Sequence, residues 1–450
     1  MGNLAKFPLM DDVLYDWNTN PSAPERFDWA GARVEIQDET LRDGAQSVSV
    51  VEPRLDDKKA LLHHAAALGV HSVALGFPAM GERAAAHVVA LAREIADARL
   101  PLAATCAART LPTDVHAVTE ASQKSGLPIE VAAFIGASRI RQIVEGWTLD
   151  DMCRRVERAV TTAVRAGHDV MFVTEDTTRA HPDSLHALYG AALRAGARRV
   201  CLADTVGCVT PDGVRRLVGW VRDVVGAGVR RVDVSGVDVS GAGVSGAGVR
   251  VDWHGHRDRG LGLANCLAAI EAGADRVHAT ALGLGERVGN VEMELLLVNL
   301  SMLGAHRHPI DCLSEYSRLA SRAFDVPIPA NHPVVGADAY ATAAGTHAAA
   351  MLKAGVLRDC LYTAFPPAMI GRHQEVRISP ASGASNVRWW LEERGYVADA
   401  ADAGLVAYLL AAAKASDRTL ALDEIEALRS EYLSSSARRD ARTAPPSARA

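Results

Sequence analysis

Two histidines stand two residues apart in the segment WHGHRD, and an aspartate lies in a distant segment, DETLRDGAQ. Side chains two residues apart on a β-strand point to the same side. A strand that ends here would therefore present His254 and His256 together. Two imidazoles and a carboxylate form a facial metal triad, which leaves positions open for substrate and water. The pattern predicts a divalent-metal site at His254, His256 and Asp43.

A glycine-rich segment, GLGERVGN, follows a later β-branched run. Glycines allow the backbone to approach a ligand closely, and the amide oxygen of Asn290 can add a neutral ligand near the metal. Glu286 and Arg287 in this segment can take part in binding a ligand. Alternatively, they form a local ion pair with each other and have no further role.

Two further polar segments, VTEDTTR and LADTVG, also follow apolar runs. Glu175, Asp176 and Thr205 are well placed there to orient a ligand. N-capping of the next helix is the alternative role for Thr205 and Asp176.

Elements that alternate along the chain must position these residues. Short β-branched runs alternate with Ala-rich amphipathic stretches, and each polar segment follows such a run. Eight strands, each followed by a helix, predict an α/β fold, a (β/α)8 TIM barrel, whose polar loops meet at one face. An open, doubly wound sheet is the competing fold. The strands are expected at 33–37, 72–75, 102–105, 130–135, 169–174, 199–203, 249–253 and 276–280.

The predicted domains follow from composition shifts along the 450 residues. A small, mainly helical C-terminal subdomain is expected after the barrel, because the strand–helix alternation stops there. The boundaries are an N-terminal extension at 1–30, the barrel at 31–310 with a low-complexity insertion at 226–249, a linker at 311–335, the helical subdomain at 336–433 and a disordered tail at 434–450.

Composition excludes several classes of protein. The chain has 48 Lys plus Arg and 54 Asp plus Glu, so its net charge gives no electrostatic attraction to nucleic acid. Only 5% of the residues are aromatic, which argues against a protein that binds nucleic acid by base stacking. No apolar run is long enough for a signal peptide or a membrane span. Seven widely spaced cysteines without a CxxC pair argue against a disulfide framework. We therefore expect a cytoplasmic protein without membrane or nucleic-acid partners.

The order of the motifs resembles the α-isopropylmalate and homocitrate synthase family, which is related to HMG-CoA lyase-like barrel metalloenzymes. DETLRDGAQ, GFP, EDTTR, ADTVG, HGH, ANCLAAIEAGAD and GLGERVGN carry the resemblance, which spans roughly residues 33–390. It implies a transferase: an acetyl-CoA-dependent Claisen condensation with a 2-oxo acid, giving a 2-substituted malate and CoA. One divalent ion, Mg, Mn or Zn, is implied as cofactor.

The resemblance also implies roles for individual residues. Asp43, His254 and His256 would hold the metal, with Asn290 nearby. Arg42 would polarise the ketone, Glu175 and His347 would transfer protons, and Tyr362 would act with His347. Those last two residues would reach the site from a neighbouring subunit, which implies a homodimer with swapped C-terminal subdomains. Gln46 and Thr205 would bind the 2-oxo acid, and the loop with Gly283, Gly285, Glu286 and Arg287 would serve acetyl-CoA.

Three segments depart from the family pattern. Ala74 stands where a glutamate is common, Arg257 where an asparagine is usual, and Arg139 and Arg141 where a TSxxH pattern is frequent. We expect Arg257 to bind an anionic ligand, with an ion pair to Asp258 or Glu286 as the alternative. This expectation favours a doubly anionic 2-oxo acid or a phosphono- or phosphinopyruvate, although compensating drift would also explain the changes.

Two other functions compete with the synthase. An HMG-CoA lyase-type cleavage would require the catalytic cysteine that such lyases carry in the glycine-rich loop, and GLGERVGN has none. A catalytically inactive barrel that acts as a binding protein is supported by Ala74 but opposed by the intact metal triad.

Overall fold

The structure, a computed structural model, describes residues 27–225 and 248–443. The chain forms two compact units, with the boundary between Ile328 and Pro329, and each is described by itself. Most of the predicted N-terminal extension and of the 226–249 insertion lies outside the described residues.

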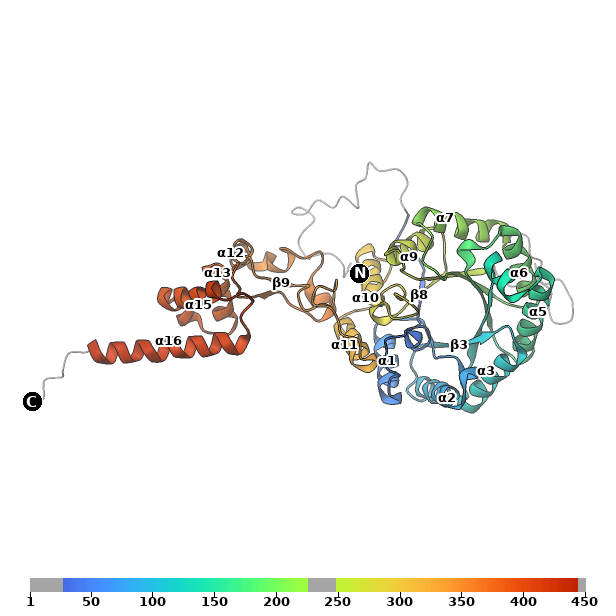
Figure 1. Cartoon of the computed structure of the whole chain (residues 1–450), viewed down its shortest axis with the longest axis horizontal. Helices are drawn as coiled ribbons and strands as arrows, with labels where there is room; N and C mark the ends of the chain where they lie inside the picture. Colours follow the sequence, from blue (N-terminus) through green and yellow to red (C-terminus); the bar gives the residue numbers. More distant parts are fainter. Residues whose placement is uncertain (1–26, 226–247, 444–450) are drawn as a thin grey trace, which may run out of the picture. The chain divides into compact units, whose positions relative to one another are not determined.

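Eight parallel strands close into a barrel in sequence order, which confirms the predicted fold class. Helices surround this ring of strands (Figure 1). Parallel strands covered by helices are buried on both faces and read as nearly continuous apolar runs. The strands are β1 Glu35–Asp38, β2 Ser72–Ala74, β3 Ala103–Arg109, β4 Ile129–Gly136, β5 Val170–Glu175, β6 Arg199–Asp204, β7 Arg250–Gly255 and β8 Arg276–Ala279.

The barrel helices follow the amphipathic spacing of the sequence. In α5, for example, Met152, Val156 and Val160 are fully buried at helical spacing, and Thr148 caps the helix by accepting a hydrogen bond from the Asp151 amide at 3.1 Å. These helices are α1 Leu55–Ala67, α2 Glu82–Asp97, α3 Pro112–Ser125, α4 Arg139–Glu145, α5 Leu149–Arg165, α6 Pro182–Arg194, α7 Pro211–Trp220, α9 Gly262–Glu271 and α10 Met293–Leu303.

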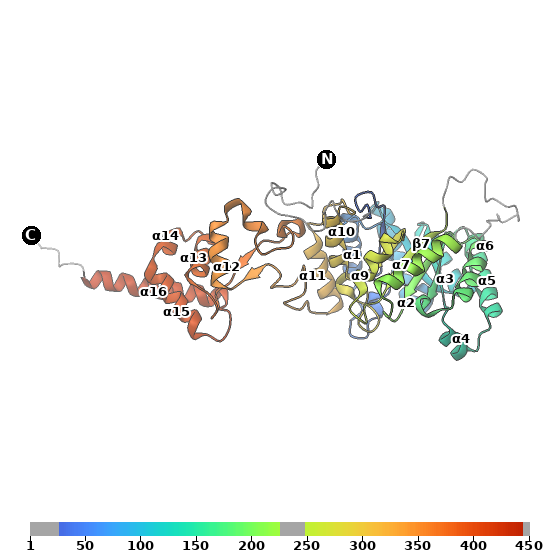
Figure 2. The ribbon, with the colours of Figure 1, turned by 90° about the horizontal axis from the view of Figure 1, so that it is seen from above.

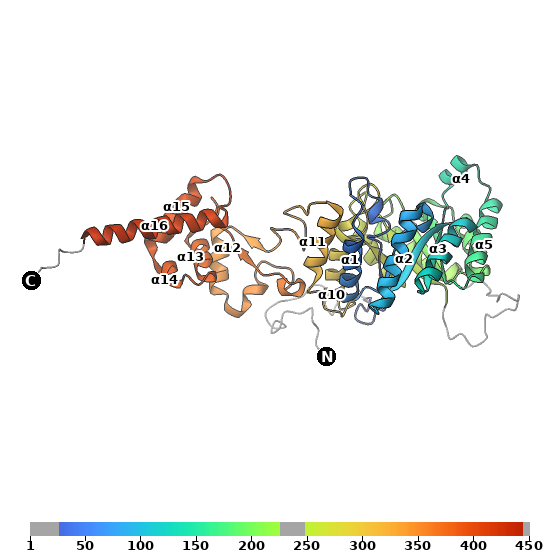
Figure 3. The ribbon, with the colours of Figure 1, turned by 90° about the horizontal axis from the view of Figure 1, so that it is seen from below.

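Helix α4 stands out beyond the body of the barrel in both edge-on views (Figure 2 and Figure 3). It belongs to the connection between β4 and α5. Ile140, Ile143 and Val144 on this short helix are 54%, 67% and 73% exposed.

None of the described helices is long and apolar enough to cross a membrane.

The predicted linker at 311–335 is partly wrong, because α11, Leu313–Phe324, is a helix of the barrel unit. Leu313, Tyr316 and Ala320 are fully buried at helical spacing, which is the apolar stripe of a packed helix. The three prolines after it lie in a stretch without helix or strand that consists largely of turns, and the stretch before them was misassigned.

The C-terminal unit is mainly helical, as predicted, with a two-stranded parallel sheet of β9, Ala341–Thr342, and β10, Glu375–Val376. Trp390, Leu405 and Leu409 lie in its core. The last helix continues to Thr443, so the prediction of a disordered tail is wrong for residues 434–443. The helices are α12 Gly345–Lys353, α13 Ala384–Glu393, α14 Val397–Ala401, α15 Ala403–Ala415 and α16 Leu422–Thr443.

Candidate active site

The loop after β1 is anchored by a buried carboxylate. Asp38 accepts hydrogen bonds from the Thr40 amide at 2.8 Å and from the Tyr316 hydroxyl at 2.7 Å. Tyr316 lies on α11, so this helix helps to position the loop. The anchored loop carries Arg42 and Asp43 into the barrel mouth.

Asp43 meets the two histidines at the end of β7. Its Oδ2 lies 3.9 Å from Nε2 of His254 and 3.7 Å from Nε2 of His256. Ligand atoms about 2.0–2.2 Å from one ion lie about 3–3.5 Å apart. The two distances from Asp43 exceed this range by a few tenths of an ångström, and the three ligand atoms all lie within 4.8 Å of one another, so modest movements would bring them around one cation; all three side chains are buried.

Burial keeps the histidines in the form that a metal needs. It lowers the pKa of His254 to about 3 and also lowers the pKa of His256. Burial alone would raise the pKa of Asp43, but Arg42 and His254 outweigh it and hold that pKa below its usual value. At neutral pH the set is therefore two neutral imidazoles and one carboxylate, which is the donor chemistry of a divalent-metal site.

The loop after β8 folds back along the end of β7 and supports Asp43. Residues His256 and Asn290 form an antiparallel bridge, and the amide of Asn290 donates hydrogen bonds to Asp43 and, at 3.0 Å, to the Leu284 carbonyl. The Asn290 Oδ1 atom has no hydrogen-bond partner among the described residues. Asn290 thus holds the aspartate and keeps a neutral oxygen available beside the triad.

Gly285 leaves room for this contact. It has a φ of +149°, and a Cβ there would lie 2.1 Å from Nδ2 of Asn290 and 2.9 Å from Oδ2 of Asp43. We predict that Gly285→Ala displaces Asn290 and lowers metal affinity about 10–100-fold, the usual effect of losing a group that orients a ligand. Metal titration of the purified protein measures this.

Gly81→Ala is the matched control, because Gly81 has a φ of +142° but open space around its Cβ. Equal losses in both variants would assign the effect to backbone strain and not to Asn290.

A second buried cluster, absent from the residues singled out in the sequence, adjoins the triad. Nδ1 of His278 lies 3.4 Å from Oε1 of Glu39, and its Nε2 lies 3.1 Å from Oδ2 of Asp252. Arg42 Nε donates to Glu39 Oε2 at 2.7 Å. Together with His254, Glu39 and His278 form another set of side chains that could hold a cation. One feature of the sequence could have indicated this cluster: Asp252 lies two residues before His254 and hence on the same side of β7.

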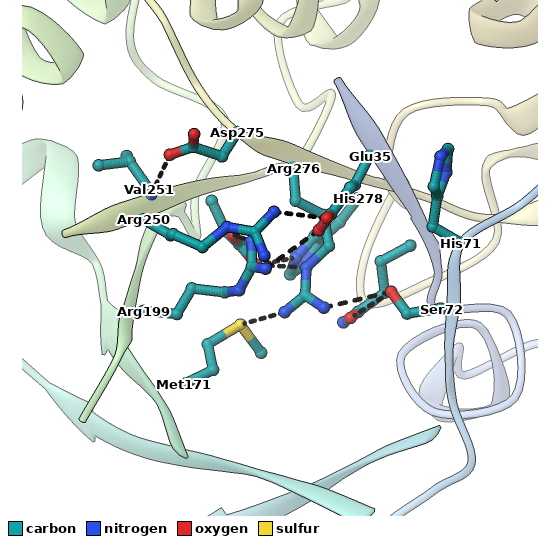
Figure 4. Close-up of polar contacts among 12 residues, drawn as sticks. Glu35, His71, Ser72, Met171, Arg199, Arg250, Val251, Asp275, Arg276 and His278 are labelled. Atoms are coloured by element: carbon teal, nitrogen blue, oxygen red, sulfur yellow. Dashed lines mark hydrogen bonds and ion pairs between the residues drawn. The ribbon is translucent and has the colours of Figure 1, made fainter. Parts of the chain in front are cut away.

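Next to His278, a network of ion pairs and hydrogen bonds lies inside the barrel (Figure 4). Asp252 accepts from Arg199 at 2.6 Å and from Arg276 at 2.7 Å. Burial alone would raise the pKa of Asp252, but Arg276 leads the groups that hold it well below its usual value. Arg276 also donates to Glu130 at 2.7 Å. A rigid, charged floor thus fixes His278 and separates the site from the other end of the barrel.

A cavity of about 330 Å³ lies over the triad. Five further residues predicted for the site line it: Gln46, Glu175, Thr205, Glu286 and Arg287. Arg42, Asp43, His254 and His256 line it too. Thr205 accepts a hydrogen bond from the Asp176 amide at 2.7 Å, so it ties two loops together instead of capping a helix. Arg287 pairs with Asp258 at 2.8 Å, not with Glu286.

The structure does not support the predicted ligand contact of Arg257. Its guanidinium pairs with Glu292 and donates to the Val288 carbonyl at 2.8 Å, and it is not among the residues that line the cavity. Glu292, and not Asp258 or Glu286 as considered from the sequence, is therefore the ion-pair partner of Arg257. The reason is the returning loop, which pairs Thr280 with Glu292 and brings that carboxylate beside the end of β7.

Two predicted residues, His347 and Tyr362, belong to the C-terminal unit. Their rings stack with centroids 4.1 Å apart, and Tyr362 is 54% exposed. The structure therefore brings these two residues together.

The HMGL-like family model matches residues 33–319, which include the triad and its loops. The chain belongs to the HMGL-like family. A 2-isopropylmalate synthase of Methanopyrus kandleri, designated probable, is 32% identical over 367 residues, covering 81% of this chain and 66% of that protein. Homocitrate synthase AksA of the same organism is 31% identical over 371 residues, covering 80% and 83%. These relatives confirm the resemblance drawn from the motifs.

Among solved structures, the HMG-CoA lyase of Bacillus subtilis is similar in fold, with a TM-score of 0.52 and 16% identity over 66% of this chain and 96% of that one. At this identity the match supports the barrel fold alone.

Proposed function

We propose that this HMGL-like protein is a divalent-metal-dependent acyltransferase that condenses acetyl-CoA with a 2-oxo acid to give a 2-substituted malate and CoA. The observation that carries the proposal is the convergence of Asp43, His254 and His256 beside Arg42 over one cavity. Synthases among the relatives support it. Asp43, His254 and His256 would hold the ion, with the Asn290 oxygen beside them.

When bound, a divalent ion would act as a Lewis acid on the carboxylate and ketone oxygens of the 2-oxo acid. Arg42 would donate to the ketone oxygen and stabilise the negative charge that forms on it. Thr205 and Gln46 would orient the substrate carboxylate, and the segment with Glu286 and Arg287 would border the acetyl-CoA side of the mouth.

The condensation needs a proton acceptor for the acetyl methyl group. Glu175 lines the cavity and is its candidate base. The methyl carbon, once deprotonated, would form a bond to the ketone carbon, and the resulting alkoxide would take up a proton. Water would then cleave the thioester, giving a second carboxylate and the CoA thiol.

We further propose that His347 and Tyr362 complete the site of a second subunit. Their mutual stacking and the exposure of Tyr362 are consistent with a contact outside their own unit. Subunits with His256→Ala are expected to regain activity when mixed with subunits carrying His347→Ala, because hybrid dimers would contain one intact site.

Acetyl-CoA-dependent thiol release by the mixture measures this effect. Random exchange makes about half of the dimers hybrids, and each hybrid has one intact site out of two. Up to about one quarter of wild-type activity is therefore expected. No recovery in a mixture shown by mass labelling to exchange subunits would contradict the swapped arrangement.

The predicted cytoplasmic location stays a prediction.

A further inference from the structure

The side of the cavity opposite the triad is mostly apolar; apart from Glu175, its polar side chain is Thr105, whose hydroxyl faces the Val73 carbonyl at 3.5 Å. The strands β2 to β5 supply it, and alternate residues on each strand face inwards. Ala107 pairs in register with Ala132, and Ala132 pairs with Met171. Barrel interiors are normally filled by bulky branched side chains in layers. Alanines at these paired positions on neighbouring strands, both of which line the cavity, leave space that a bulkier side chain would fill.

Aromatic rings border this space. Phe77, which follows β2, and Phe134 on β4 meet edge to face, with ring centroids 5.9 Å apart. Ala74, at the end of β2, adds a third small side chain to the wall. We call this wall the apolar pocket; it consists of Ala74, Phe77, Ala107, Ala132, Phe134 and Met171.

Charge on this side does not favour a second acid group on the substrate. Glu175 is the ionisable group that β2 to β5 contribute to the cavity lining, and it would repel another carboxylate. Arg109 and Arg141 lie near this wall, and each is within ion-pair distance of a carboxylate, although the buried Nε of Arg141 makes no hydrogen bond among the described residues. Arg109 forms two hydrogen bonds with Asp114, at 2.7 and 3.0 Å, and Arg141 lies 3.3 Å from Glu145 and 3.7 Å from Glu175.

We propose that the apolar pocket binds the side chain of the 2-oxo acid, and that this side chain is a large apolar group with an aromatic ring. The inference rests on the proposed condensation and adds its substrate class. Aromatic rings and a thioether make favourable contacts with a further ring. The cations that line the cavity, Arg42 and Arg287, lie on the loops after β1 and β8 and not on the strands that form the apolar pocket. The inference replaces the doubly anionic substrate expected from the sequence.

The test compares thiol release with acetyl-CoA and four acids: phenylpyruvate, 2-oxoisovalerate, pyruvate and 2-oxoglutarate. We expect kcat/KM for phenylpyruvate to exceed that for pyruvate by about tenfold or more, as burial of a ring in a preformed apolar pocket predicts. The product should have the mass of 2-benzylmalate. A preference for 2-oxoglutarate, or pyruvate used as well as phenylpyruvate, would overturn the inference.

Filling the pocket supplies the second arm. Ala107→Leu and Ala132→Leu should each lower the ratio of kcat/KM for phenylpyruvate to kcat/KM for pyruvate by about tenfold or more. Ala103→Leu is the matched control, since Ala103 is exposed on the same strand, β3. Activity with pyruvate reports that each variant is folded, and an equal loss on both acids in the pocket variants would contradict a role in side-chain selection.

Failure of the inference is distinguishable from failure of the proposed function. Thiol release with pyruvate but not with phenylpyruvate overturns the substrate class alone. No 2-oxo acid-dependent thiol release with any of the four acids, in protein shown to contain metal, overturns both.

Discussion

Replacing His256 by alanine is expected to abolish stoichiometric metal binding and to lower acetyl-CoA condensation by at least about a thousandfold. His256 offers a neutral nitrogen 3.7 Å from Asp43, and burial keeps its pKa below the usual value. Loss of one of three protein ligands leaves an incomplete facial set. Elemental analysis after dialysis measures the metal, and thiol release measures the activity.

The matched control is His186→Ala, an exposed histidine of α6 in the same barrel. This variant should keep both metal and activity. A His256→Ala protein that still binds one ion per chain with wild-type affinity would show that the ion sits elsewhere, for instance at the Glu39, His254 and His278 cluster.

Replacing Arg42 by lysine should lower kcat by roughly 10²–10³-fold, the usual loss when a group that stabilises a developing oxyanion is removed. Lysine keeps the positive charge near Glu39 and Asp43 but not the planar fork that meets two groups at once. Arg42 makes contacts of 2.7 Å to Glu39 and 3.3 Å to Asp43. Metal content should therefore stay near one ion per chain.

Arg215→Lys on the outer surface, where Arg215 pairs with Glu271 at 2.6 Å, is the control for this exchange. A loss of less than about fivefold in Arg42→Lys would remove Arg42 from the chemistry. If Arg42→Lys lost bound metal as well as kcat, the role of Arg42 would instead be to hold Asp43 in position.

Much of the barrel could be predicted because short β-branched or apolar runs alternate with amphipathic helical stretches, and both patterns are local features of the sequence. The alternation rule also placed His254 and His256 on one side of β7. Helix α11 was missed although its apolar spacing is regular, because the prolines after Phe324 suggested that the whole stretch was a linker.

The partners of the site residues were harder to predict, because they depend on how distant loops return. Glu292 pairs with Arg257, and Asn290 contacts Asp43, through the loop that folds back beside β7. Closure of the barrel sets β1 beside β8 and so brings Glu39 to His278. None of these three contacts follows from spacing along the chain.

The most direct test of the central claim is a thiol-release assay on the full chain before chelation, after chelation and after restoring Mg²⁺, Mn²⁺ or Zn²⁺, with the product identified by mass. The proposed function predicts CoA release that requires both a 2-oxo acid and the metal, with one 2-substituted malate formed per CoA. CoA release that continues without any 2-oxo acid, or full condensation activity in chelated protein shown to be free of metal, would contradict it.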